Sequence, residues 1–155
     1  MYKEILVPLD GSDLSKAALP HARELARAFG AHLTLLAVIQ PLAAVYAWSA
    51  SPYGMVVATP AVEIEAEREQ AAAEQYMNQA KDDLKTQGVN AECLITEGDP
   101  GSEICDRARE LKADLIVMST HGRSGVRRWV YGSVAEKVLR GADAPVLLVR
   151  AHRET

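Results

Sequence analysis

The amino-acid sequence predicts an α/β fold, in which a doubly wound, five-stranded parallel sheet carries helices on both faces. Three observations lead to this prediction. Short runs of Val, Ile and Leu alternate with segments of helical periodicity, in the order β-α-β-α-β-α-β-α-β. The strand-like runs are apolar almost throughout, which is typical of parallel strands covered on both faces. The chain has 155 residues, enough for one domain, which we expect to span 1–151, with 152–155 as a short tail.

The first strand and the first helix occupy the N-terminal part of the chain. We expect the strand at Ile5–Val7 and a helix that ends at Gly30. Ser12 or Asp13 would cap this helix, because their side-chain oxygens can accept from free backbone N–H groups. Pro20 should bend the helix or open one of its backbone hydrogen bonds.

The second strand and a long helix follow, separated by a segment without charged residues. We expect the strand at 33–39 and the helix from about 62 to 87. The many glutamates of this helix indicate a solvated face. Three prolines interrupt the uncharged segment 41–62, whereas a membrane-spanning helix needs about 20 consecutive, mostly apolar residues. We interpret the segment as a long loop, either packed on the protein's own surface or serving as a lid or partner surface.

The second half of the chain supplies three more strands and two helices. The strands are expected at 91–96, 115–118 and 146–149. One helix should begin after the turn at 98–101, and the other should run from about 133 to 140.

Composition narrows the classes of function. The formal net charge is −4, which argues against a general nucleic-acid or anionic membrane surface. The two cysteines and four histidines show no metal-ligand spacing, so we predict no metal site. The N-terminus lacks the basic start and long apolar stretch of a signal peptide, and we expect a cytoplasmic protein.

Ligands of doubly wound sheets bind beyond the C-terminal ends of the strands, where the strand order reverses. The first strand usually lies at that reversal, which draws attention to the loop that follows it, Pro8–Ser12. Within this loop, Asp10 is placed to accept hydrogen bonds from ribose hydroxyls. It is equally placed to cap the next helix. Position alone leaves both roles open.

The loop after the fourth strand, Ser119–Ser133, has the features of a phosphate site. Its glycines let a ligand approach the backbone closely; they are Gly122, Gly125 and Gly132. Ser133 opens a capping-box pattern at the start of a helix, whose N-terminus suits an anion. Arginines add positive charge: Arg123, Arg127 and Arg128. The alternative is purely structural, with a helix cap, turn glycines and solvated arginines.

Several of these segments together resemble the universal stress proteins. They are Val7–Ser12, Gly98–Pro100, Ser119–Gly125 and Gly132–Val138, and Pro145–Val149 is similar to the last strand of that family. The resemblance covers essentially the whole chain. It implies a sheet with the strand order 3-2-1-4-5.

The ATP-binding branch of this family carries a glycine, two residues, a second glycine, nine residues, and then glycine with serine or threonine. Gly122 and Gly132-Ser133 match this motif, whereas Ser119 occupies the first glycine position. The resemblance implies ATP as ligand, with Mg²⁺ or Mn²⁺ bound through the phosphates only. The nucleotide-binding residues that it implies are Pro8, Leu9, Asp10, Val38, Ser119, His121, Gly122, Arg123, Gly125, Gly132, Ser133 and Val134.

Within that set the resemblance also implies roles. The Pro8–Asp10 segment would hold the adenosine and Val38 would meet the adenine. Gly122 and Gly132-Ser133 would hold the phosphates.

The same resemblance implies a homodimer. The order 3-2-1-4-5 leaves the last strand at an edge of the sheet, and an exposed apolar edge strand tends to pair with another chain. The pairing residues would be Val146, Leu147, Leu148 and Val149.

Three functional hypotheses follow. The first is a stress-response regulator that binds ATP and presents different conformations to an unknown protein partner. The second is a dimeric interaction protein without nucleotide, to which Ser119 points. The third is a slow ATPase or an autophosphorylating protein with His121 as base. The hydroxyls available to that enzyme are Ser119, Thr120, Ser124 and Ser133.

Overall fold

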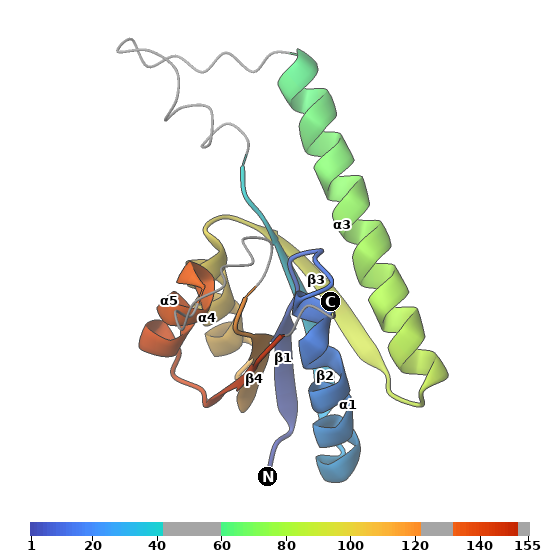
Figure 1. Cartoon of the computed structure of the whole chain (residues 1–155), viewed down its shortest axis with the longest axis vertical. Helices are drawn as coiled ribbons and strands as arrows, with labels where there is room; N and C mark the ends of the chain where they lie inside the picture. The colour runs from blue at the N-terminus through green and yellow to red at the C-terminus, as the bar shows by residue number, and fades with distance from the viewer. Residues whose placement is uncertain (42–59, 122–131, 152–155) are drawn as a thin grey trace.

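The computed structural model describes residues 1–41, 60–121 and 132–151 (Figure 1). Its elements are β1 (Glu4–Pro8), the 3₁₀ turn η1 (Ser15–Ala17), α1 (Ala18–Phe29), β2 (His32–Ile39), α3 (Pro60–Thr86), β3 (Ala91–Glu97), α4 (Pro100–Glu110), β4 (Leu115–Ser119), α5 (Ser133–Gly141) and β5 (Val146–Val149). Every predicted strand and helix is therefore present. The loop predicted at 41–62 lies, except at its ends, outside the described residues.

The strands form one parallel sheet in the order β3-β2-β1-β4-β5, which confirms the predicted topology. The chain winds from β1 to β2 and β3 in one direction, and then crosses to place β4 on the other side of β1. In this register Ile5 pairs with Leu33 on one side and with Leu115 on the other. The order therefore reverses between β1 and β4, and this is the point where ligands of such sheets bind.

Two apolar layers cover the sheet, one on each face. Side chains of β1 alternate between them, because successive residues of a strand point to opposite faces. Ile5 and Val7 pack with α1 and α3, whereas Leu6 packs with α4 and α5. All three side chains are fully buried, which explains why the strand is apolar throughout. Figure 1 shows the two helix pairs on opposite sides of the sheet.

The start of α1 differs from the prediction. A 3₁₀ turn precedes the helix, and the N-cap is Ala17, so neither Ser12 nor Asp13 caps α1. Pro20 is the third residue of α1. The first N–H groups of a helix have no partner within it, so a proline at this position removes no intrahelical hydrogen bond.

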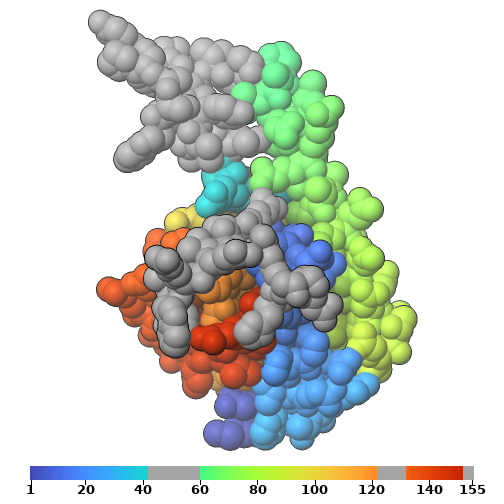
Figure 2. Space-filling model, in the orientation of Figure 1, coloured from blue at the N-terminus to red at the C-terminus, as the bar shows by residue number. Residues whose placement is uncertain are grey.

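The two halves of α3 differ in their surroundings. The buried residues of this 27-residue helix are Met77, Ala80 and Leu84, all in its second half. Figure 1 shows the first turns extending past the C-terminal ends of the strands, and Figure 2 shows α3 along one side of the molecule. The second half therefore anchors the helix, and the first half stands beyond the edge of the sheet. Within the described ranges, no helix is both long and apolar enough to cross a membrane.

Candidate functional site

A cavity of about 460 Å³ lies at the C-terminal ends of β1, β2 and β4. Its size falls within the range of about 300–1,000 Å³ that is typical of small-molecule sites. Pro8, Val38 and Met118 come from the strand ends. Further walls come from the loop after β1, from α3 and from the N-termini of α4 and α5. Because α3 and α5 pack on opposite faces of the sheet, the cavity extends over the C-terminal strand ends from one face to the other at the switch point.

The loop after β1 forms one side of this cavity and is held by short polar contacts. The Leu9 N–H donates to the Leu36 carbonyl at 2.8 Å, which extends the pairing with β2. The backbone N–H of Ser12 donates to Asp10 Oδ1 at 2.9 Å, and the Ser12 hydroxyl donates to the same oxygen at 2.5 Å. Gly11 adopts a φ of +83°, which favours glycine. Asp10 therefore orders the turn that carries it.

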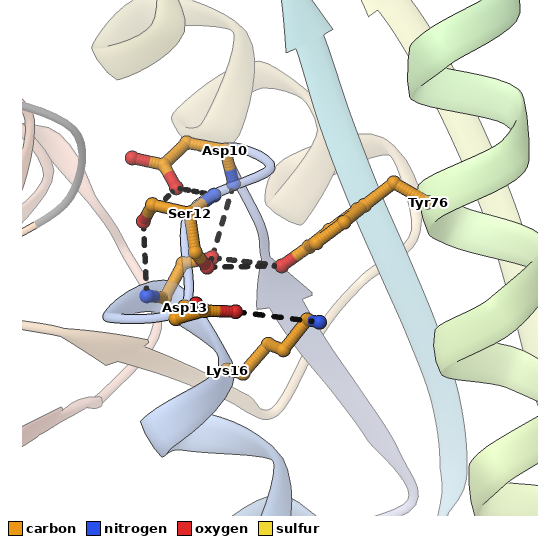
Figure 3. A network of polar contacts seen from close by, with 6 residues as sticks. Asp10, Ser12, Asp13, Lys16 and Tyr76 are labelled. Atoms are coloured by element: carbon orange, nitrogen blue, oxygen red, sulfur yellow. Dashed lines mark hydrogen bonds and ion pairs between the residues drawn. The ribbon is translucent and has the colours of Figure 1, made fainter.

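A second set of contacts ties this loop to α3. The Ser15 hydroxyl donates to the Ser12 carbonyl at 2.8 Å, and its oxygen lies 3.0 Å from the Tyr76 hydroxyl. Tyr76 also donates to the Ser12 carbonyl at 3.3 Å. Figure 3 shows Tyr76 reaching from α3 toward the loop that carries Asp10 and Ser12. The wall formed by α3 and the wall formed by the β1 loop are thus connected by side-chain hydrogen bonds.

The N-terminus of α5 forms the opposite side. Its N-cap is Gly132, which has no side chain that could cap the helix. The predicted capping box is therefore wrong, because Ser133 is the first helical residue. The N–H groups of the first three helical residues have no acceptor within a helix. Together with the positive end of the helix dipole, they suit an anion.

Gly132 is packed tightly against the end of β4. Its N–H donates to the Thr120 carbonyl at 2.9 Å, and a Cβ added here would lie 3.2 Å from that carbonyl oxygen. A side chain at this position would crowd the strand and project at the start of α5. The absence of one brings the backbone to the cavity wall.

The N-terminus of α4 also reaches the cavity, through Pro100 and Ile104. Unlike α5, it is capped by a side chain: Asp99 accepts from the Ser102 N–H at 2.9 Å. The hydrogen bond from the Lys137 ammonium, at 2.6 Å, and the Ser102 N–H lower the pKa of Asp99 to about 2. The positive N-terminal end of α4 is thus compensated by a carboxylate of the chain itself.

The end of β4 accounts for three further residues of interest. Ser119 is buried, and its hydroxyl donates to the His121 carbonyl at 2.7 Å. The Thr120 hydroxyl lies 3.1 Å from His121 Nδ1. The serine at the first glycine position of the motif therefore turns its hydroxyl to the backbone of its own loop.

Most of the predicted nucleotide-binding residues meet at the cavity. Those that line it are Pro8, Leu9, Asp10, Val38, Ser119, Gly132, Ser133 and Val134. His121 is not among the described residues that line it. Gly122, Arg123 and Gly125 lie outside the described residues, as do Arg127 and Arg128. In the described ranges, no group of three or more His, Cys, Asp or Glu side chains is placed to hold a metal ion.

Sequence reasoning missed the wall contributed by α3. Its cavity-lining residues are Glu69, Ala72, Ala73 and Tyr76. The sequence offered one signal: Ala72 and Ala73 lie one helical turn before Tyr76, which directly precedes the buried Met77. The abundance of glutamate in this helix instead indicated a solvated face. With Asp10, Glu69 makes this side of the cavity acidic, opposite the electropositive end of α5.

Comparison with known proteins agrees with this architecture. The model of the universal stress protein family matches residues 1–150. Universal stress protein MJ0531 of Methanocaldococcus jannaschii is 35% identical over 150 residues, which cover 97% of this chain and 83% of that protein. The solved structure of MJ0577 from the same organism matches with a TM-score of 0.81 and 26% identity, covering 99% of each chain.

A third relative was solved with a ligand. It is a universal stress protein in complex with cAMP, which matches with a TM-score of 0.70 and 26% identity over 97% of this chain and 98% of that one. The family match spans nearly the whole chain. The chain belongs to the universal stress protein family.

Proposed function

We propose that this protein binds ATP in the cavity at the switch point and acts as a stress-response regulator whose nucleotide-bound form differs in conformation or partners. One observation carries the proposal. The cavity of about 460 Å³ has an uncapped helix N-terminus on one side and the Asp10 carboxylate on the other. A phosphate at one end and sugar hydroxyls at the other match these two groups.

The charges of the cavity favour one orientation of the nucleotide. The phosphates would lie at Gly132, Ser133 and Val134, where the first backbone N–H groups of α5 face an anion. Phosphates at the opposite side would meet the carboxylates of Asp10 and Glu69. The adenosine therefore belongs at that side.

The adenosine end also has a suitable surface. Pro8, Leu9 and Val38 offer apolar contacts from the strand ends, and Ala72 and Ala73 add small side chains from α3. Asp10 would accept from a ribose hydroxyl. The relative solved with cAMP supports an adenine base and a ribose as the ligand class.

Further residues of the motif would take part in binding. Gly122, Arg123 and Gly125 would complete the phosphate site, and His121 and Ser119 would border it. Mg²⁺ or Mn²⁺ would be bound through the phosphates.

The experiment that tests this function has two steps. Freshly purified protein is denatured, and the released small molecules are chromatographed. The stripped protein is then titrated with MgATP and with MgGTP in a calorimeter. We expect adenine nucleotide in the first step, or saturable binding of ATP that exceeds that of GTP in the second. No released nucleotide together with no heat of binding would overturn the proposal in favour of a nucleotide-free dimeric protein.

We also propose that β5 pairs with its copy in a homodimer. This strand forms the edge of the sheet, and Leu147 on it is 36% exposed. Such an edge offers unpaired backbone groups and an apolar side chain to a second copy.

Light scattering after size exclusion tests this dimer. The wild-type chain of 16.8 kDa should elute as a dimer, and Leu147→Lys should shift it toward the monomer. Leu139→Lys is the control, because Leu139 is similarly exposed (42%) but lies on α5. A wild-type monomer would refute the dimer.

A further inference from the structure

The hydrogen bonds between α3 and the β1 loop suggest how the sugar is recognised. We propose that Tyr76 is a positioning residue of the nucleotide site: by holding Ser12 and Ser15 it fixes the Asp10 carboxylate for the ribose, so the preference for ribose over deoxyribose depends on it. This inference rests on the proposed nucleotide function.

Tyr76 makes hydrogen-bond contacts across the fold. The Tyr76 hydroxyl lies 3.0 Å from Ser15 Oγ and donates to the Ser12 carbonyl at 3.3 Å. These partners are 61 and 64 residues away in sequence. Figure 3 shows the tyrosine spanning the space between α3 and the loop. One phenol oxygen thus joins two elements that no local structure connects.

The two serines in turn hold Asp10. Ser12 donates two hydrogen bonds to Asp10 Oδ1, one from its backbone N–H and one from its hydroxyl. The Ser15 hydroxyl accepts from the Asp10 N–H at 3.4 Å. Both ends of Asp10, the backbone and the carboxylate, are therefore held by residues that Tyr76 contacts. A shift of either serine changes the direction in which the carboxylate points.

Burial makes this contact hard to replace. Ser15 is only 3% exposed, so water has little access to its hydroxyl. Without the tyrosine oxygen, the Ser15 hydroxyl keeps its hydrogen bonds with the Ser12 carbonyl and the Asp10 N–H but loses its contact with α3, which solvent replaces poorly. The loop would then no longer be held against α3 and could shift relative to it.

The tyrosine is itself held in place. It precedes the buried Met77 in α3, and the Lys16 ammonium lies 5.1 Å from the centroid of its ring. Lys16 in turn pairs with Asp13 at 3.6 Å. Phenylalanine would keep the ring and its cation–π contact and lose only the hydroxyl. Tyr76→Phe is therefore a clean removal of the positioning bond.

The experiment compares the affinities of ATP, 2′-deoxy-ATP and 3′-deoxy-ATP for wild type, Tyr76→Phe and Ser15→Ala. One hydrogen bond corresponds to about a three- to tenfold change in affinity. We expect the wild type to prefer ATP over at least one deoxy analogue by that factor. Both variants should lose the preference, because their affinity for ATP falls while that for the deoxy analogue stays. The double variant should lose no more than either single one.

Tyr2→Phe is the matched control. It also removes a phenol hydroxyl, but Tyr2 packs edge-on against Phe29 at 5.1 Å, before the start of β1 and at the far end of the sheet. Its ribose preference should equal that of wild type. If Tyr76 acts on stability alone, Tyr76→Phe should lower the unfolding midpoint and weaken the binding of all three nucleotides equally, leaving the ribose preference intact.

The outcomes separate this inference from the proposed function. If the wild type binds no nucleotide, both fail. If it binds ATP but shows no ribose preference, or if Tyr76→Phe keeps the preference, only this inference is overturned. Should Tyr76→Phe not fold, Ser15→Ala decides: a retained ribose preference in that variant refutes positioning through the loop.

Discussion

The N-termini of α4 and α5 lie on the same face of the sheet and reach the same cavity, yet they are capped differently. Asp99 caps α4, and its carboxylate is held by the Ser102 N–H and the Lys137 ammonium. Gly132 begins α5 without a side-chain cap. In the first helix the chain supplies its own anion. In the second, the positive end is left for another group.

The residue at the N-cap therefore decides whether a helix end is stabilised by its own chain or stays accessible to a ligand. A carboxylate at this position satisfies free N–H groups and stabilises the helix. Glycine gives up that stabilisation and keeps the backbone accessible. Lys137, on α5, forms an ion pair with Asp99, so α5 and the N-terminus of α4 are also linked by charge.

The largest effect should come from closing the open end. Gly132→Val adds a side chain where even a Cβ would lie 3.2 Å from the Thr120 carbonyl oxygen. Because hydrogen bonds to charged groups are lost, we expect the affinity for ATP to fall about ten- to a hundredfold in calorimetry.

The control for that variant is Gly141→Val. Its added Cβ would also be tight, 3.3 Å from Cys105 Sγ, but it lies at the other end of α5. It should bind ATP as the wild type does. Equal losses in both variants would mean that α5 is merely destabilised.

A smaller effect is expected from removing the N-cap of α4. Asp99→Ala removes the cap of α4 and should lower the free energy of unfolding by about 1 kcal/mol in urea titrations. Asp99→Asn keeps a good capping side chain and should lose less. Affinity for ATP should stay unchanged in both. A loss of affinity with either would show that α4 also takes part in binding.

The smallest effect concerns pH. The pKa of Asp99 is lowered in the folded state to about 2, below its ordinary value of 3.8. The stability that this carboxylate contributes is therefore fully present above pH 4 and is lost as the pH falls from about 4 to about 2. Because the ion pair is exposed, we expect less than about 1 kcal/mol.

The measurement is the difference in unfolding free energy between wild type and Asp99→Asn at several pH values. It should shrink as the solution is acidified through this window. A constant difference would mean that the charge of Asp99 adds nothing to its capping hydrogen bond.

Much of the fold follows from local patterns. The runs around Ile5, Leu35 and Val117 predict buried parallel strands, because only strands covered on both faces are apolar throughout. The turn Gly98–Gly101 marks the start of α4, since Asp99 and Pro100 favour the N-cap and the first helical position. Alternation then limits the topology to a doubly wound sheet.

The site was predictable only in part. Its strand-end residues follow from topology, because parallel strands bring their C-terminal ends to one edge. The capping box failed at Ser133 because Gly132 is the N-cap: its carbonyl accepts from the Glu136 N–H at 2.9 Å, while its own N–H donates to the Thr120 carbonyl. Local sequence offers both residues for the same role.

Local patterns in the sequence dictate the order of strands and helices along the chain, the burial of the sheet on both faces and the end of the sheet at which ligands bind. The partner of each polar group at that end depends on the tertiary structure. Tyr76 lies in a helix whose glutamates indicated solvent, and the packing of Met77, Ala80 and Leu84 sets the rotation that turns it to Ser15. The two cases differ in sequence separation. Apolar periodicity is repeated along the chain, whereas one hydrogen bond between residues 61 positions apart leaves no pattern in either segment.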